Sequence, residues 1–163
     1  LCIRRNLSFR IVLPKSLHLP ALRSLHLQRV KFTAIDNDCA EPFSNCHLLN
    51  TLFLQNCEMH DNAKVLHISN STLSRLKITS YISFLKTQAY PVALSTPNLN
   101  SITITGIARH QLSSSCNLAF LGPVYIGVSF APSSTSTFIR WLQVLANVKI
   151  LTLTWETLQR ILY

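Results

Sequence analysis

LNTLFLQNC, residues 49–57, is the stretch from which the fold can be predicted. It places apolar side chains at Leu49, Leu52 and Leu54 and ends on Cys57. The same spacing, apolar-x-x-apolar-x-apolar, recurs in windows that start at Leu22, Leu49, Leu73, Leu99, Leu121 and Val148. Successive starts are 22 to 27 residues apart. Self-similarity at such a period indicates a chain built from stacked copies of one small unit.

A period of 20–29 residues with this apolar pattern is typical of a leucine-rich repeat. We expect each window to form one short strand, with alternate side chains pointing inward and outward. The sequence therefore predicts an α/β fold, a leucine-rich-repeat solenoid or horseshoe of about six repeats, with a parallel sheet on its concave face. Because no linker interrupts the pattern, residues 1–163 are expected to form a single domain, open at both ends.

The segments between the windows should return along the convex side. Helical spacing of apolar residues predicts a helix over 137–146, with Trp141 in the core. We expect a short helix at 43–50, a long polar loop at 106–118, and a degenerate first strand between Leu7 and Leu17.

Composition excludes several classes of protein. Of the 163 residues, 48% are hydrophobic and only 13% are charged, which excludes an intrinsically disordered chain. Three glycines are too few for a glycine-rich phosphate loop. The uncharged stretch 111–139 is interrupted by Pro123 and Pro132, so we expect no membrane span.

The net charge of +9 raises the possibility of nucleic-acid binding. The basic residues are scattered, however, and only Arg4 and Arg5 are adjacent. A nucleic-acid groove usually combines clustered Lys and Arg with interleaved aromatic residues. We therefore expect no specific nucleic-acid partner.

The five cysteines show no pairing pattern. They form no Cys-x-x-Cys pair, and Cys46, Cys57 and His60 match no familiar zinc spacing. We expect buried free thiols in a reducing, intracellular compartment, cytoplasmic or nuclear, and no metal or cofactor.

No catalytic set is visible either. A nucleophile needs a base within hydrogen-bond reach and a third orienting group. Carboxylates are scarce, since Glu156 is the only one after Asp61. We expect Glu58, His60 and Asp61 to form a solvated turn and the chain not to be an enzyme; a zinc or thiol hydrolase is a remote alternative.

What remains is a binding surface on the outward positions of the strands. Phe53 and Tyr125 are candidate anchors, because aromatic side chains dominate protein interfaces. Arg75 and Lys77 would favour an acidic partner or a phosphate. The alternative is that these positions are ordinary solvated sheet residues. The candidate partner-binding residues are His26, Gln28, Phe53, Gln55, Arg75, Lys77, Thr103, Thr105, Tyr125 and Thr152.

Several phrases of the sequence resemble a known family. LPKSLHLPALRSLHLQRVKF at 13–32 resembles the opening repeats of plant F-box/leucine-rich-repeat proteins, often those that end in an FBD domain. FSNCHLLNTLFLQNC at 43–57 is similar to their recurring phrase, and LHISNSTLSRLKI, TPNLNSITITG and LANVKILTLTWETLQRIL fit later repeats. In that family Cys46 and Cys57 would occupy repeat positions, which agrees with structural thiols.

The resemblance implies a substrate receptor of an SCF-type ubiquitin ligase. In the family an N-terminal F-box binds a Skp-type adaptor and the repeats hold the target protein. No F-box precedes the first window here and no FBD domain follows the last, so we interpret the chain, which begins at Leu1, as a fragment. The alternatives are the repeat part of another intracellular interaction protein or immune receptor, or a pseudogene-derived piece. Exposed apolar ends would make the fragment poorly soluble alone.

Overall fold

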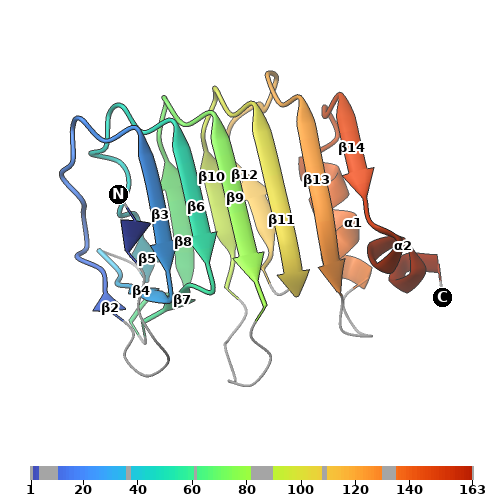
Figure 1. The fold of residues 1–163 in the computed structure, drawn as a ribbon, viewed down its shortest axis with the longest axis horizontal. Helices are drawn as coiled ribbons and strands as arrows, with labels where there is room; N and C mark the ends of the chain where they lie inside the picture. Colours follow the sequence, from blue (N-terminus) through green and yellow to red (C-terminus); the bar gives the residue numbers. More distant parts are fainter. Residues whose placement is uncertain are drawn as a thin grey trace.

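The computed structural model describes residues 2–3, 11–35, 38–60, 62–81, 90–107, 110–129 and 135–162. Its largest element is a seven-stranded sheet in which all neighbouring strands are parallel. The strands stand side by side in chain order (Figure 1): β1 (Cys2–Ile3), β3 (Ser24–Gln28), β6 (Thr51–Gln55), β9 (Arg75–Ser80), β11 (Ser101–Ile107), β13 (Pro123–Ser129) and β14 (Ile150–Leu153). Each turn of the chain thus adds one strand, and the architecture is solenoid-like.

The register of this sheet reproduces the sequence period. Leu52 pairs with Leu25 on one side and with Leu76 on the other. The row continues through Ile102, Val124 and Leu151. Equivalent positions of successive windows therefore lie side by side, and the prediction of stacked parallel strands is confirmed.

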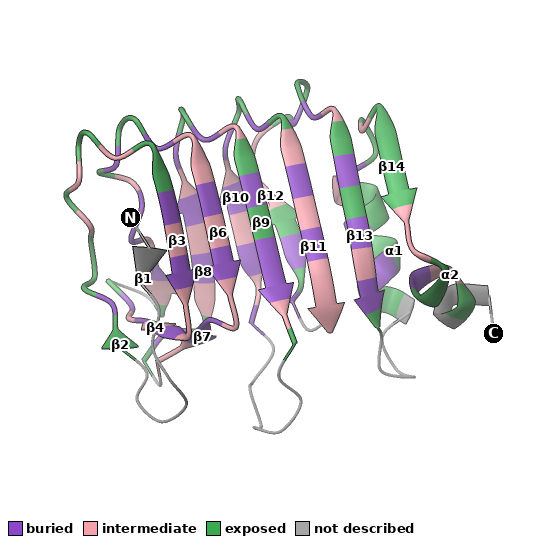
Figure 2. Cartoon of the chain, in the orientation of Figure 1, coloured by how far each residue is buried: buried purple, intermediate pink, exposed green. Residues whose placement is uncertain are grey.

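Alternation along each strand separates the core from the surface. Leu25, Leu52, Leu76 and Ile102 are buried, while their neighbours along each strand are half-buried or exposed (Figure 2). A buried Leu or Ile contributes about 1.5–3 kcal/mol to stability relative to an exposed one. The stack of inward leucines and isoleucines is the main apolar core of the protein.

A second parallel sheet forms the other side of the coil. Its four strands, in spatial order, are β12 (Leu112–Ser114), β10 (Val92–Ser95), β8 (Val65–Ser69) and β5 (Cys39–Ala40). They lie behind the seven-stranded sheet (Figure 1), and Leu66, Ile68 and Leu94 join the same core. A small third sheet, β2 (Ile11–Val12), β4 (Val30–Phe32) and β7 (Glu58–Met59), lies at the end of the coil near β3 and β6.

Two strands of the main sheet end on a residue with positive φ: Arg29 (56°) follows β3 and Asn56 (51°) follows β6. Gly106 also has positive φ (97°), but it lies within β11, where it pairs with Ser80 and Val128. At Gly106 a Cβ atom would lie 2.3 Å from the carbonyl oxygen of Ser80. Only glycine combines this conformation with this close approach.

A buried asparagine fixes the turn that returns the chain to the main sheet. Asn70 Nδ2 donates to the carbonyl oxygens of Phe43 (3.1 Å) and Cys46 (3.0 Å). Its Oδ1 accepts the N–H of Thr72 at 3.0 Å and the Thr72 hydroxyl at 2.9 Å. One side chain therefore joins two successive turns of the coil.

Two helices complete the described fold. Helix α1 (Thr135–Val144) confirms the helix expected at 137–146 and packs against β12. Trp141 is buried, as expected, and its indole N–H donates to His110 O at 2.9 Å. Helix α2 (Trp155–Leu162) packs against β13 and was not expected from the sequence.

Three expectations for the connecting segments were wrong. Residues 43–50 form turns, not a helix. Their buried side chains, Phe43, Cys46 and Leu49, recur every third residue. Turns in which the N–H of Cys46 donates to the carbonyl oxygen of Phe43, and the N–H of Leu49 to that of Cys46, place all three inside. The expected loop at 106–118 contains the end of β11 and strand β12.

The first strand was also misplaced. Between residues 7 and 17, the extended part that the structure describes is β2, which pairs with β4 in the small sheet rather than with the main one. The neighbour of β3 in the main sheet is instead β1, and residues 4–10 lie outside the described part of the chain.

Candidate binding face of the seven-stranded sheet

The outward side chains of the main sheet form rows that cross the strands, and we call the surface they make the open face. No described element lies in front of it in Figure 1. Its middle row consists of His26, Phe53, Lys77, Thr103, Tyr125 and Thr152. A second row contains Gln28, Gln55, Thr79 and Thr105, and Arg75 lies beside Thr51 in a third. The structure thus brings all ten candidate residues to one surface.

Three side chains of the middle row are stacked on one another. The rings of His26 and Phe53 are nearly parallel (13°), with centroids 4.1 Å apart. Lys77 Nζ lies 4.8 Å from the centroid of the Phe53 ring, a cation–π contact worth about 0.5–1 kcal/mol at an exposed site. Because His26 and Lys77 come from the strands on opposite sides of Phe53, both ring faces are covered. Phe53 can offer a partner its edge only.

The positive charge of the open face is concentrated on β9. Arg75 and Lys77 are exposed, and Arg75 Nε donates to Thr51 Oγ1 at 3.2 Å. The guanidinium also approaches Asn50 Oδ1, at 3.4 Å. These neutral partners orient Arg75 without neutralising it, so its charge stays available to an acidic group.

Thr79 departs from the expected exposure. It occupies an outward position of β9, yet it is only 2% exposed. Its hydroxyl lies 2.9 Å from Thr105 Oγ1 on the neighbouring strand. Thr79 therefore supports Thr105 rather than reaching a partner.

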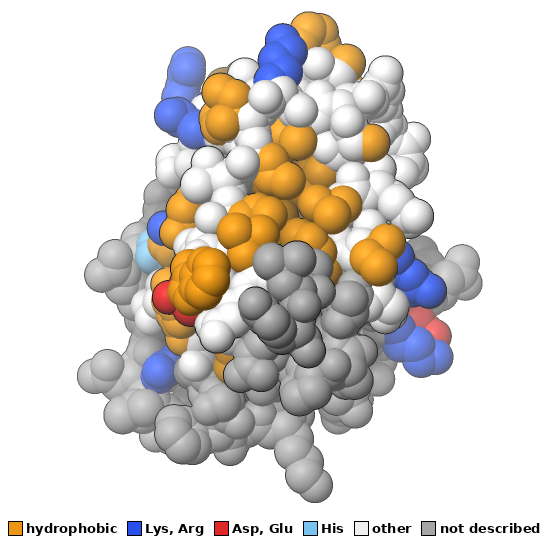
Figure 3. All heavy atoms as spheres, turned by 90° about the vertical axis from the view of Figure 1, so that its right-hand side faces the viewer, with side chains coloured by type: hydrophobic (Ala, Val, Ile, Leu, Met, Phe, Trp, Pro, Cys, Tyr) orange, Lys and Arg blue, Asp and Glu red, His pale blue; other side chains and the backbone are white. Residues whose placement is uncertain are grey.

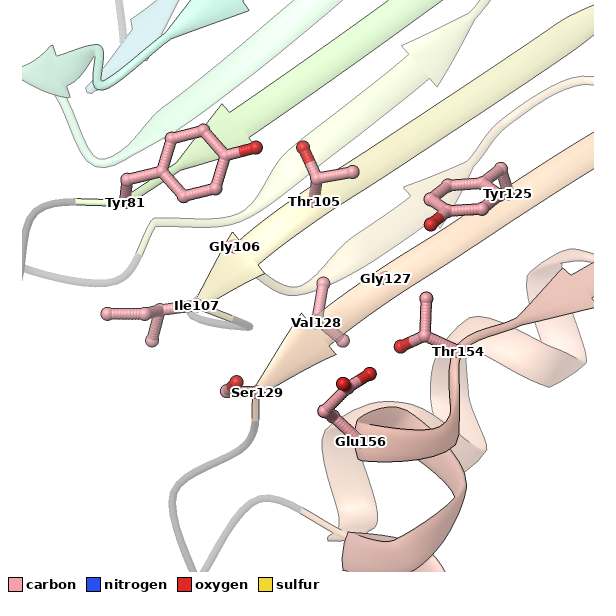
Figure 4. A pocket seen from close by; sticks show the side chains of 10 residues that line it. All are labelled: Tyr81, Thr105, Gly106, Ile107, Tyr125, Gly127, Val128, Ser129, Thr154 and Glu156. Carbon is pink, nitrogen blue, oxygen red and sulfur yellow. The ribbon is translucent and has the colours of Figure 1, made fainter.

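A hollow of about 360 Å³ opens on this face where β9, β11 and β13 end. Tyr81 and Tyr125 stand on its two sides, and Glu156 of α2 points in from a third (Figure 4). Gly106 and Gly127 belong to its floor. Tyr125 lies over Gly127, since a Cβ there would be 2.9 Å from Tyr125 Cε1.

Sequence reasoning missed Tyr81 and Glu156 at this hollow. A signal for both was present. Tyr81 continues the outward alternation of Arg75, Lys77 and Thr79 by one step. Glu156 likewise follows Thr152 and Thr154 at two-residue spacing, although the chain has entered α2 there.

The cysteine side chains that the structure describes are free thiols. Burial raises the pKa of Cys57 to about 12, and burial also raises the pKa of Cys46. Burial, followed by the nearby Glu41 carboxylate, raises the pKa of Cys39. None of these three thiols is activated as a nucleophile, because the thiolate is the reactive form.

The prediction of a solvated turn at Glu58, His60 and Asp61 was wrong for Glu58. Glu58 lies in β7, where it is buried and pairs in register with Lys31 of β4, so it is part of the small sheet and not of a solvated turn. Asp61 lies outside the described residues. Within the described ranges, no three His, Cys, Asp or Glu side chains come together as a metal site.

The C-terminal end of the coil carries a second surface of interest. Large apolar side chains gather there (Figure 3). In β14 and α2, Ile150 and Trp155 are 60% and 66% exposed. Leu151 points inward by its register with Val124 but is 37% exposed. β14 is the last strand of the sheet, so no described strand pairs with its outer edge.

Comparison of the chain with protein-family models, with curated proteins and with solved structures finds no match. None of the helices in the described part of the chain is both long and apolar enough to cross a bilayer.

Proposed function

We propose that the chain is the target-recognition part of a plant-type F-box/leucine-rich-repeat protein. In this proposal residues 1–163 form one domain, a horseshoe of about six leucine-rich repeats that holds a protein substrate on its concave face. The chain itself performs no catalysis. The parent protein would serve an SCF-type ubiquitin ligase, with a Skp-type adaptor bound through an F-box outside this sequence.

The observation that supports the proposal best is the register of the main sheet. The apolar windows, 22 to 27 residues apart, align strand by strand, which is the arrangement that a repeat of this length requires. The phrases at 43–57 and 66–78 supply the resemblance to the F-box family.

The open face supports a binding role. It presents hydroxyls, amides, two aromatic side chains and a pair of cations on flat, regular strands that a partner can cover. Solenoid proteins commonly bind partners along such an extended surface. The exposed cations of Arg75 and Lys77 favour a partner with acidic groups opposite β9.

Free thiols support an intracellular location. Cys39, Cys46, Cys57 and Cys116 are all unpaired, as is usual where glutathione keeps thiols reduced.

Charge reversal on the open face tests the proposed interaction. The full chain, its Lys77→Glu variant and a Lys15→Glu control would be immobilised at equal density and exposed to the same plant extract. Lys15 is an exposed cation away from the main sheet, so the control makes the same change in net charge. We expect specific protein partners that Lys77→Glu loses and Lys15→Glu retains. Partners that both variants retain equally would contradict the use of this face.

The ubiquitin-ligase part needs a separate test. Translation of the coding sequence upstream of Leu1 should give an F-box, and the resulting longer protein should co-purify with a Skp-type adaptor while the 163-residue chain does not. An upstream nucleotide-binding domain would favour an immune receptor instead and overturn this part of the proposal.

A further inference from the structure

The hollow at the ends of β9, β11 and β13 differs in chemistry from the rest of the open face. Around β9 the surface is basic, through Arg75 and Lys77. The hollow itself contains a carboxylate, Glu156, and is lined by no cation. Its volume of about 360 Å³ lies within the usual range of ligand sites, about 300–1,000 Å³.

Two tyrosines form the walls of this hollow. Tyr81 is 62% exposed and Tyr125 is 39% exposed, so their rings are accessible from solvent. Tyr81 directly follows β9 and Tyr125 lies in β13, with β11 between the two strands. The two rings stand on opposite sides of the hollow in Figure 4. The negative face of an aromatic ring attracts a cation.

Glu156 adds a full negative charge to these two rings. Its side chain projects from the first turn of α2 toward Gly127 (Figure 4). The ion pairs that the described residues form, Lys64–Asp38 and His67–Glu41, are elsewhere, on the strands of the back sheet and their turns. In the described part of the chain, the Glu156 carboxylate is therefore not neutralised by a salt bridge.

The floor and rim of the hollow suit a planar, hydrogen-bonding group. Gly127 of the floor is covered by the Tyr125 ring and the Thr154 methyl group, which lie 2.9 and 3.0 Å from where a Cβ would stand, so the Tyr125 ring is held against the floor. The hydroxyl groups of Thr105 and Thr154 lie at the rim and can accept hydrogen bonds (Figure 4). A guanidinium, with five N–H donors and a flat surface for aromatic rings, matches this set of groups best.

We propose that the hollow binds a cationic side chain, an arginine or a lysine, presented by the protein partner of the open face. The inference deepens the proposed function and rests on it for the identity of the partner. It specifies a partner with acidic groups opposite Arg75 and Lys77 and a basic side chain at the ends of β9, β11 and β13. A uniformly acidic partner would not satisfy both places.

Titration with blocked amino acids tests the site directly. The full chain would be titrated with N-acetyl-arginine amide, and separately with N-acetyl-citrulline amide, which has the same shape but no charge, while the amide resonances of Thr105, Gly106 and Gly127 are followed by NMR. We expect saturable binding of the arginine probe in the millimolar range and no saturable shift with citrulline. Equal binding of the two probes would show that the hollow selects shape and not charge, and would overturn the proposal.

Variants locate the effect. Glu156→Gln should weaken arginine binding about fivefold, and so should Tyr81→Leu, whose exposed position makes it harmless to the core. Glu41→Gln removes a carboxylate near the back sheet and should leave the affinity within about twofold, since salt screens distant surface charges. Equal losses in Glu156→Gln and Glu41→Gln would reduce the effect to net charge and contradict the site.

The two proposals can fail separately. If a partner lost by Lys77→Glu binds Glu156→Gln as tightly as the unaltered chain, the cation site is refuted and the proposed function stands. If the arginine probe binds as expected but no partner depends on Lys77, the proposed function is refuted while the cation site itself is supported.

Discussion

Asn70 offers the sharpest test of how successive turns of the coil are held together. Its amide nitrogen satisfies two buried carbonyl oxygens, those of Phe43 and Cys46. The replacement Asn70→Asp keeps the size and the acceptor oxygen but removes both donors. At neutral pH it also places a negative charge against the two carbonyl oxygens.

The magnitude follows from the lost partners. Each of the two carbonyl oxygens keeps one backbone donor, the N–H of Cys46 (3.1 Å) for Phe43 and the N–H of Leu49 (2.9 Å) for Cys46. The loss of the two hydrogen bonds from Asn70 therefore costs about 1–3 kcal/mol, and the negative charge buried beside the carbonyl oxygens adds to this cost. Domains of ordinary size are stable by only about 5–15 kcal/mol in total. The substitution should therefore remove a large share of the free energy of unfolding.

Urea denaturation at pH 7, followed by circular dichroism, measures this loss. Asn98→Asp is the matched control, because Asn98 is exposed and donates one hydrogen bond, to Ser71 O at 2.8 Å. We expect less than about 1 kcal/mol for the control. A deficit for Asn70→Asp no larger than that of the control would refute the assignment of Asn70 as the link between turns.

The pH dependence gives a second check on the same variant. Burial against carbonyl oxygens raises the pKa of the introduced carboxyl in the folded state above its value in the unfolded chain. A group whose pKa is raised on folding favours the native state only below its unfolded pKa and loses this contribution as the pH rises through the folded pKa. Relative to the unaltered protein at the same pH, the deficit should therefore shrink as the pH falls from 7 through the raised pKa of the folded state, and it should level off below about pH 4, the pKa of the carboxyl in the unfolded chain. A constant deficit from pH 7 to pH 3 would contradict the argument.

Further predictions concern single groups, and urea unfolding measures the first three. Gly106→Ala should lower stability by about 2 kcal/mol or more, because of its positive φ and the Ser80 carbonyl 2.3 Å from the new Cβ; a neutral result would be inconsistent with this backbone conformation within β11. Thr96→Val should raise stability by about 1 kcal/mol, because the buried Thr96 hydroxyl has no described hydrogen-bond partner. Thr157→Val should lower it by about 1–3 kcal/mol, since Thr157 Oγ1 accepts the Val128 N–H at 2.9 Å; equal effects at the two threonines would refute the distinction. Cys57, with its pKa raised to about 12, should resist an aromatic disulfide reagent at pH 8 in the native protein and react after denaturation, as mass spectrometry of the labelled peptide would show.

The main sheet could be predicted from the sequence because its signal repeats. Each window supplies apolar residues at fixed spacing, and the copies reinforce one another even where one of them, such as that starting at Leu121, is irregular. The back sheet was missed although Leu66, Ile68, Val92 and Leu94 also alternate. Its strands, of two to five residues, do not carry the apolar-x-x-apolar-x-apolar window of Leu, Ile and Val that marks the main sheet, so no repeated signal reinforces their short alternation.

The start of helix α2 has a local sequence signal, but the strand alternation just before it makes this signal hard to recognise. Thr154 begins the helix, where Leu158 N donates to its carbonyl oxygen, and its hydroxyl lies 3.0 Å from Thr157 Oγ1. A threonine followed by an acidic residue in the first turn favours a helix start. Because Ile150 to Thr154 continue the strand alternation, the start of α2 at Trp155 is hard to locate from the sequence alone.

The sequence predicts which side chains point toward the open face, but not which of them contact one another. Alternation gives the direction of every side chain on a strand, so the ten candidate residues were placed on one surface. The stack of His26, Phe53 and Lys77 depends on the register between strands that lie 24 to 27 residues apart, which no single strand encodes. The burial of Thr79 likewise depends on Thr105 of the neighbouring strand.

The order of the strands in the main sheet determines how the protein loses its structure. Each strand contacts only those one turn before and one turn after it, so the ends can fray while the middle persists. The exposed rim at Ile150 and Leu151 is where such fraying should start, and amide hydrogens of β14 should exchange earlier than those of β9. A partner lying along the middle row, from His26 to Thr152, would clamp all of these turns at once and make the whole coil melt as a single unit.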